Sequence, residues 1–189
     1  MTVQRADARR NYARILAVAE QEVAAHGAEA SLERIARVAG VGSATVRRHF
    51  PGRRALLEAV FQERIAALCT HAEELAAADD PRAALLEWLE ALAAYAASAR
   101  GMAEALTGDT GGAADQGGQV SACSARLGDG ATPLLRNAAR AGAVAADVTV
   151  TDLITLVTGI ALATEHHRDP TAEAHRLLAL TVAGISPRP

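Results

Sequence analysis

Apolar residues recur every three or four positions along most of the chain, which is the spacing of helices that bury one face. The repeat is clearest between residues 32 and 50. Its first half has a single apolar face made of Leu32, Ile35, Ala36 and Ala39. Its second half repeats Val46 and Phe50 four residues apart. Gly40 lies between the halves, where glycine adopts a left-handed backbone at little cost. The pattern predicts two short helices joined by a tight turn.

The polar positions of the second short helix fall on the side opposite its apolar residues. A rotation of about 100° per residue places five side chains on or beside this outward face. They are Ala44, Arg47 and Arg48, flanked by Thr45 and His49. Two helices with such a turn and a basic outward face are typical of a helix-turn-helix, whose second helix enters the DNA major groove. A helical hairpin with a merely solvated basic face is the alternative interpretation.

Similar repeats, bounded by proline, glycine and aspartate, predict the other elements. Helices are expected over residues 7–26, from Arg53 to residue 78, and from Pro81 onward. The glycine-rich residues 107–118 are expected to form a flexible loop. Two short helices are expected over 120–127 and 133–141, separated by Gly128, Asp129 and Gly130. A final antiparallel pair of helices is expected over 152–167 and 171–185.

The composition favours helix throughout, because alanine and leucine dominate the apolar residues and only 3% of residues are aromatic. The expected fold class is therefore all-α. Residues 1–10 lack the apolar segment of a secretion signal, and the most apolar run, 153–164, is too short to span a bilayer. The two cysteines, Cys69 and Cys123, provide no disulfide framework. These features predict a cytoplasmic protein without a membrane segment.

Charge is divided unevenly along the chain. Residues 1–54 hold ten arginines and five acidic residues, a net charge of +5. Residues 55–189 hold nine arginines and seventeen acidic residues, a net charge of −8. A protein with a basic N-terminal part and an acidic remainder is expected to orient its basic part toward a polyanion such as DNA. We therefore expect a DNA-binding head over 1–54, a connecting helix over 53–78 and a second helical domain over 55–189.

A longer set of residues makes the comparison with a known family specific. The set consists of Arg14-Ile15-Leu16 through Gly27, Ile35-Ala36, Gly40-Val41, Thr45-Val46, His49-Phe50 and Leu56-Leu57. In these residues the chain resembles the N-terminal domain of TetR-family repressors, over roughly its first 65 residues. The resemblance implies an all-helical homodimer with a three-helix DNA-binding head and a divergent C-terminal domain that senses a ligand. It also implies a nucleoid-associated protein in the cytoplasm.

Three residues depart from the family pattern. Gly42 replaces the serine that usually caps the second short helix, Ala44 replaces a glycine, and Arg47 replaces a tyrosine. Glycine is still an acceptable N-cap. An arginine at position 47 adds either a phosphate attraction or a guanine contact, so the operator preference of relatives does not transfer to this chain.

The predicted DNA contacts divide into two kinds. Arg47 and Arg48, with Ser43 and Ala44 beside them, are expected to reach base edges, where a bidentate arginine pairs naturally with guanine. Phosphate contacts are expected from Thr45, His49 and Arg53, and from Ser31 with the amides that follow this predicted N-cap. A loose basic arm is predicted from Arg5, Arg9 and Arg10.

A small-molecule effector is expected between the head and the final helix pair. The larger side chains there are Trp88, Leu92, Tyr95, Met102, Leu106, Cys123, Leu127, Leu134 and Leu135, with Thr155, Thr158 and Glu165 as polar anchors. Enclosed apolar cavities with a few polar groups are the usual small-molecule sites. The alternative is that these side chains are ordinary core. Tyr95 and Trp88 are the stronger candidates, because each has an apolar body and a polar group.

The final helix pair, residues 152–185, is predicted to form a homodimer. One apolar stripe contains Leu153, Leu156, Val157, Ile160, Ala161 and Thr164, and the other contains Leu177, Leu178, Thr181, Val182 and Ile185. Two such pairs would meet as a four-helix bundle, which resembles the family's usual interface. The alternative is that both stripes pack within one subunit.

Other chemistry finds little support. His166 and His167 are adjacent on a predicted helix, so their side chains diverge and do not easily chelate one metal ion, even with His175 and Glu165 nearby. No phosphate-binding loop or catalytic cysteine arrangement is present. We therefore expect no enzyme, metal or cofactor.

The sequence predicts a dimeric repressor that a small molecule releases from a palindromic double-stranded DNA operator. The alternative is a helical dimer that binds a ligand or partner and whose head no longer reads an operator.

Overall fold

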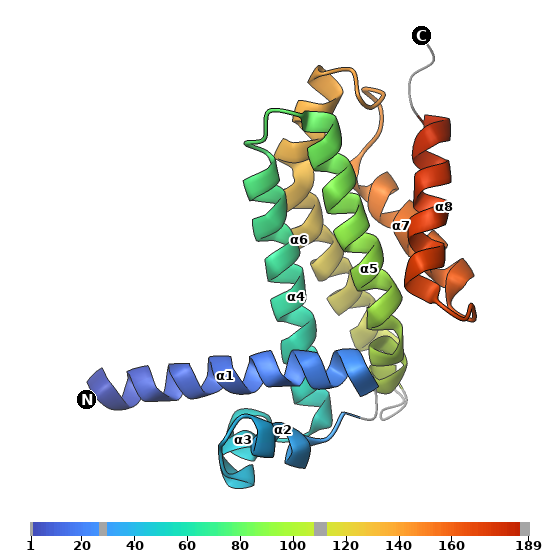
Figure 1. Cartoon of the computed structure of the whole chain (residues 1–189). Coiled ribbons are helices and arrows are strands. Elements are labelled where there is room, and N and C mark those ends of the chain that lie inside the picture. Colours follow the sequence, from blue (N-terminus) through green and yellow to red (C-terminus); the bar gives the residue numbers. More distant parts are fainter. Residues whose placement is uncertain (1, 27–29, 108–112, 186–189) are drawn as a thin grey trace. The chain divides into compact units, whose positions relative to one another are not determined.

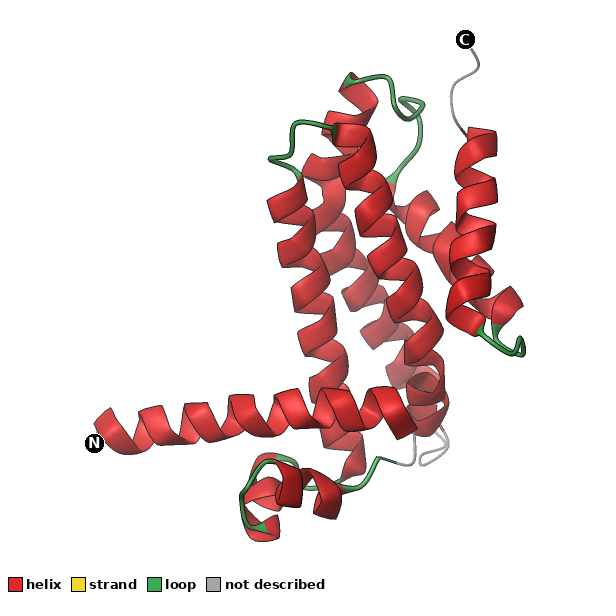
Figure 2. Cartoon of the chain, in the orientation of Figure 1, coloured by secondary structure: helices red, strands yellow, loops and turns green. Residues whose placement is uncertain are grey.

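The computed structural model describes residues 2–26, 30–107 and 113–185, and within these ranges every regular element is a helix (Figures 1 and 2). The all-α fold class is confirmed. The helices are α1 Thr2–His26, α2 Leu32–Val38, α3 Ser43–His49, α4 Arg53–Leu75, α5 Pro81–Thr107, α6 Ala113–Arg140, α7 Val150–Thr164 and α8 Pro170–Ile185. None of the described helices is long and apolar enough to cross a membrane.

The chain divides into two compact units. The first unit comprises residues 1–63 and 99–112, and the second comprises residues 64–98 and 113–189. Helices α4 and α5 contribute residues to both units.

The core of the first unit is built mainly from one face of each of the helices α1 to α4. Its members are Ile15, Leu16, Ala19, Val23, Ala30, Ile35, Ala36, Ala39, Val46, Phe50, Leu56, Leu57 and Val60. The apolar repeat of residues 32–50 therefore forms the contacts that its spacing predicts, and the two short helices lie where they were expected.

The start of α1 differs from the prediction. The helix begins at Thr2 rather than near residue 7, so the backbone at Arg5, Arg9 and Arg10 is helical and not a loose arm. Local pairs within the helix accompany this extension. Arg10 forms an ion pair with Asp7, and Arg14 donates to Asn11 over 3.3 Å. Pairs three residues apart on a helix stabilise it modestly.

The prediction for residues 107–141 is also wrong in part. Helix α6 covers residues 113–118, which were expected to be loop, and it continues to Arg140 where two separate helices were expected. Residues 108–112 lie outside the described part of the chain. The proline at position 133 removes one backbone donor, yet the helix carries on through it. One buried face explains this continuity, because Leu127, Ala131, Leu134 and Ala138 recur at helical spacing.

The second unit is organised around a tryptophan. Trp88 of α5 is fully buried, and its Nε1 donates a hydrogen bond to the Leu68 carbonyl of α4 over 3.1 Å. Asn137 of α6 likewise donates its Nδ2 to the Ala76 carbonyl over 2.8 Å. These two bonds satisfy polar groups that burial would otherwise leave unpaired, and they link α4 to α5 and the residue just after α4 to α6.

The final helix pair is present, but its apolar stripe is used differently from the prediction. Five of the predicted interface residues of α7 are buried within the chain: Leu153, Val157, Ile160, Ala161 and Thr164. Leu178 of α8 is also buried, whereas Ile185 lies outside the residues whose side chains are described. The α7 stripe therefore packs mostly inside one subunit, whereas Leu177, Thr181 and Val182 of the α8 stripe are only partly buried. The large exposed apolar side chains of the pair are Leu162 and Leu180, at 60% and 59% exposure.

Candidate nucleic-acid interface

The turn between α2 and α3 is closed by backbone hydrogen bonds around Gly40. This residue has a φ of 64°, the left-handed region that glycine adopts most readily. The amide of Val41 donates to the Ala36 carbonyl over 3.0 Å, and the Gly40 amide donates to the Arg37 carbonyl over 3.2 Å. Together these bonds form a Schellman motif, which ends α2 and redirects the chain into α3.

Helix α3 separates its buried and exposed faces as the sequence predicts. It begins after Gly42, whose extended backbone serves as the N-cap, and it buries Val46, with Phe50 buried just beyond its end. Thr45 and His49 are half-buried at the edges. The exposed side chains form what we call the α3 basic face, composed of Ser43, Ala44, Arg47 and Arg48.

The two arginines of the α3 basic face are held differently. Arg47 Nη2 lies 2.8 Å from Glu33 Oε1 of α2, in an ion pair whose side chains are 62% and 59% exposed. The pKa of Glu33 is lowered, first by a hydrogen bond from its own backbone amide and then by the Arg47 guanidinium. Arg48 is exposed, and within the described part of the chain no ion pair or hydrogen bond holds its side chain.

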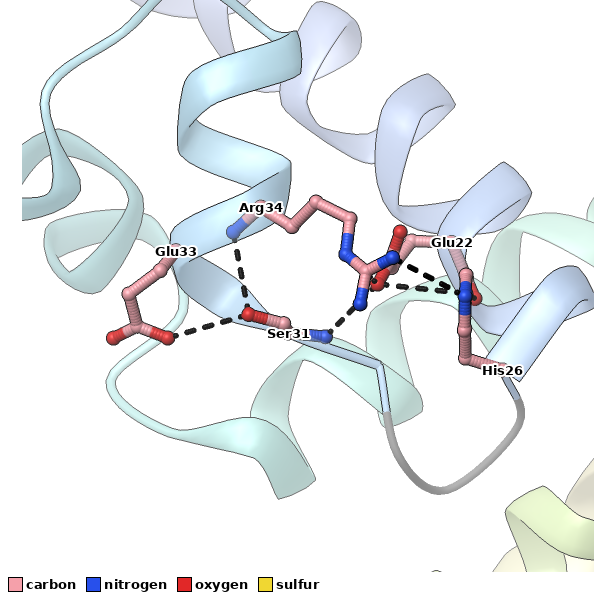
Figure 3. A network of polar contacts seen from close by, with 5 residues as sticks. All are labelled: Glu22, His26, Ser31, Glu33 and Arg34. Atoms are coloured by element: carbon pink, nitrogen blue, oxygen red, sulfur yellow. Dashed lines mark hydrogen bonds and ion pairs between the residues drawn. The ribbon is translucent and has the colours of Figure 1, made fainter.

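A buried carboxylate ties the end of α1 to the start of α2 (Figure 3). Glu22 Oε1 lies 3.0 Å from Arg34 Nε and 3.5 Å from His26 Nδ1, and it accepts a hydrogen bond from the Ser31 amide over 3.3 Å. Ser31 Oγ in turn accepts from the Arg34 amide, so its predicted role as the N-cap is confirmed. The Ser31 hydroxyl and amide thus have partners inside the chain.

Sequence reasoning missed Glu22, although a signal for it exists. The residue falls seven positions after Ile15 and three after Ala19, which places it on the apolar face of α1. A carboxylate on such a face is buried only when cations or amides surround it. An acidic residue on the apolar face of one helix, close in sequence to the start of the next helix, therefore indicates a buried carboxylate that bonds to that helix start.

Two of the predicted phosphate contacts are partly covered by protein. The His49 ring packs edge-on against Tyr12, with centroids 5.7 Å apart, and its Nε2 is buried without a hydrogen-bond partner. Tyr12 also stacks on Phe50 at 5.4 Å. The guanidinium of Arg53 is half-buried, with Nε and Nη2 shielded from solvent. Contact of either residue with a phosphate stays a prediction.

Family models of known proteins match both the helix-turn-helix and the C-terminal part of the chain. Residues 15–60 match the family model for bacterial regulatory proteins of the tetR family, and residues 80–187 match the model for the C-terminal domain of SbtR-like transcriptional regulators. The second match alone spans more than half of the chain. This chain belongs to the TetR family. Among curated protein sequences, none matches it.

Solved structures of TetR regulators resemble the whole chain. A TetR transcriptional regulator from Streptomyces coelicolor is 37% identical, with a TM-score of 0.77, and the alignment covers 94% of this chain and 99% of that one. A TetR regulatory protein from Mycobacterium vanbaalenii is 33% identical, with a TM-score of 0.72 and coverage of 97% and 99%. The regulator FadR from Bacillus subtilis, solved in complex with stearoyl-CoA, is 18% identical, with a TM-score of 0.59 and coverage of 92% and 99%, so it shares the fold alone.

Among the residues whose side chains the structure describes, the predicted effector residues of this TetR-family chain do not gather in one cavity. Trp88, Leu92 and Leu127 are buried in the core of the second unit, and the indole N–H of Trp88 is already bonded to Leu68. Tyr95 lines an open hollow of about 290 Å³ with Arg64, Ala67, Leu68 and Ala94. Met102 and Cys123 lie outside the residues whose side chains are described.

The threonines predicted as polar anchors lie on α7. Thr155 lines a groove of about 520 Å³ whose walls come from α6 and from the start of α7. Thr158 is exposed and does not line this groove. No cluster of three histidine, cysteine or acidic residues suited to a metal ion occurs among the residues that the structure describes.

Proposed function

We propose that this TetR-family regulator is a dimeric repressor that reads a palindromic operator through α3 and leaves it when a small molecule binds the second unit. The observation that carries the proposal is the α3 basic face. Two exposed arginines stand on the helix that the Schellman turn projects from the first unit, opposite its buried residues. A guanidinium presented in this way suits the acceptor pair of guanine in the major groove.

The hollow beside Tyr95 supports the effector half of the proposal. It is mostly apolar, and its lining includes Tyr95 and Arg64. Apolar sites with a few polar groups are those that small molecules favour. Bacillus subtilis FadR, which shares the fold, was solved in complex with stearoyl-CoA. Binding that favours a state with lower operator affinity would release the repressor by simple linkage.

The exposed leucines of the final helix pair support the dimer. Leu162 of α7 and Leu180 of α8 are large apolar side chains left on the surface of the second unit. Small residues beside them, Gly159 and Ala163 on α7 and Ala183 and Gly184 on α8, are exposed as well and would permit close helix approach. A homodimer through residues 152–185 would cover these side chains and give two heads for two half-sites.

The test is a gel shift with DNA from upstream of the protein's own gene and an excess of nonspecific competitor. The proposal expects one defined complex that footprints to a palindrome, followed by release when candidate effectors are screened. Smeared binding that salt removes equally from any DNA would contradict operator reading. It would favour the other function, a helical dimer that binds a ligand or partner.

A further inference from the structure

We infer that Glu33 is a specificity-determining residue, whose carboxylate holds Arg47 in an ion pair and thereby withholds that charge from DNA phosphates. The inference rests on the proposed binding of DNA by α3. It concerns the position at which this chain has arginine and the family pattern has tyrosine, so the pair is a feature of this chain.

The geometry makes Glu33 the fixed member of the pair. Its Oε2 lies 3.5 Å from the Ser31 hydroxyl, and its carboxylate also accepts from its own backbone amide at the start of α2. Arg47 reaches it from α3, fourteen residues further along the chain, and contributes a single atom, Nη2, to the contact. Both side chains are more than half exposed, so the pair lies on the surface and not in the core.

This arrangement treats a phosphate and a base edge differently. A phosphate that approaches Arg47 also approaches the Glu33 carboxylate, so two anions compete for one cation and the net attraction is small. The edge of guanine has no net charge, so the Glu33 carboxylate repels it far less than it repels a phosphate. Because a guanidinium has five N–H donors, the contact through Nη2 leaves others for the acceptors of guanine. Glu33 therefore selects against nonspecific binding while leaving base reading intact.

The test compares Glu33→Gln with the natural protein on operator and on random duplex, over a range of salt concentrations. Neutralising Glu33 frees Arg47 to neutralise about one more phosphate. Affinity for random DNA should rise about threefold at low salt, and the salt dependence should steepen by about 0.9 in log–log slope. Affinity for the operator should rise less, so the ratio of specific to nonspecific affinity should fall.

Glu58→Gln is the matched control. Glu58 pairs with Arg54 at the same distance of 2.8 Å in the same unit, but both residues lie on α4 and not on α3. The control removes one negative charge and breaks one half-buried ion pair, so it reports the combined effect of net charge and of an arginine released away from α3. A second control introduces Glu33→Gln into an Arg47→Gln background, where the inference expects no further change in salt slope.

The outcomes separate the inference from the function on which it rests. If the natural protein binds neither duplex, both the proposed function and the inference are refuted. If the natural protein binds DNA but Glu33→Gln changes the salt slope no more than Glu58→Gln does, only the inference fails. The same holds if Glu33→Gln has an equal effect on the salt slope in the Arg47→Gln background. Loss of helix α2 in the variant would weaken binding, which is opposite to the expected change, and thermal unfolding followed by circular dichroism would detect it.

Discussion

Gly130 of α6 lies directly against Cys69 of α4. A β-carbon added at position 130 would stand 3.0 Å from Cys69 Cβ and 3.2 Å from Cys69 Sγ. Contacts this short are tighter than nearly all real Cβ contacts, so a side chain at position 130 would push α4 and α6 apart by a few tenths of an ångström. The Cys69 thiol also donates to the Arg126 carbonyl one turn earlier on α6, over 3.5 Å.

Gly130→Ala is therefore expected to destabilise the second unit, whereas Gly128→Ala should stabilise it. Both glycines lie within α6, where alanine is favoured over glycine by about 1 kcal/mol. A β-carbon at position 128 meets nothing within 4 Å. Overpacking at position 130 costs about 1–3 kcal/mol, which offsets or exceeds the helix gain. Free energies of unfolding from urea titration should differ in this order, and equal values for the two variants would contradict the close contact.

The same glycines show where sequence reasoning reaches its limit. Gly128, Gly130 and Pro133 all oppose a helix by local propensity, and they led to the prediction of two short helices. The structure keeps one helix because its buried face and its close approach to Cys69 outweigh those costs. Local propensity is weak compared with tertiary packing, and packing partners far along the chain cannot be read from spacing.

The helix-turn-helix could be predicted because its determinants are local. Gly40 and Gly42 set the turn and the cap, and Val46 and Phe50 fix which face is buried, all within a segment of eleven residues. The candidate base contacts follow from that face. The pairing of Arg47 with Glu33 depends instead on how two helices are placed, so a helical periodicity does not reveal it.

Loss of Glu22 is expected to destabilise the first unit. Glu22→Ala would leave the Ser31 amide and the Arg34 guanidinium without their buried acceptor, at a cost of about 1–3 kcal/mol. Gln21→Ala is the control, since Gln21 is exposed on the same turn of α1. Chemical unfolding should separate the two variants, and similar stabilities would mean that water replaces the carboxylate without loss.

The exposed arginine and the half-buried one should have different effects on DNA binding. Arg48→Ala removes a proposed base contact and should cost about 1–3 kcal/mol on the operator with little change on random DNA. Arg53→Ala removes a proposed phosphate contact, so it should weaken binding to all sequences and shallow the salt slope by about one unit. Fluorescence anisotropy with the operator and the random duplex measures the affinity of each variant and its salt dependence. Equal losses on operator and random DNA for both variants would refute the division of roles.

The capping box of α7 should make stability sensitive to acid. The hydroxyl of Thr149 and then its amide donate to the Asp152 carboxylate, at 2.6 Å and 2.9 Å, and lower the pKa of Asp152 below 3.8. A lowered pKa stabilises the fold above pH 3.8, and this contribution is lost as the pH falls through the lowered value. Asp152→Asn should therefore narrow the drop in melting temperature between pH 7 and about pH 3. Asp147→Asn, which precedes the cap, should leave that drop unchanged, and a drop of natural size in Asp152→Asn would contradict the prediction.

The exposed leucines of α7 and α8 give the sharpest test of the dimer. A dimer interface buries apolar side chains, and charges placed at its centre are costly to desolvate. Leu162→Glu and Leu180→Glu should therefore shift the protein from dimer to monomer at micromolar concentration, as measured by sedimentation equilibrium. Val38→Glu is the control, because Val38 of α2 is 63% exposed in the first unit and lies outside the proposed interface. Dimers that persist in both leucine variants would place the interface elsewhere, and dissociation in all three would indicate a general effect of added charge.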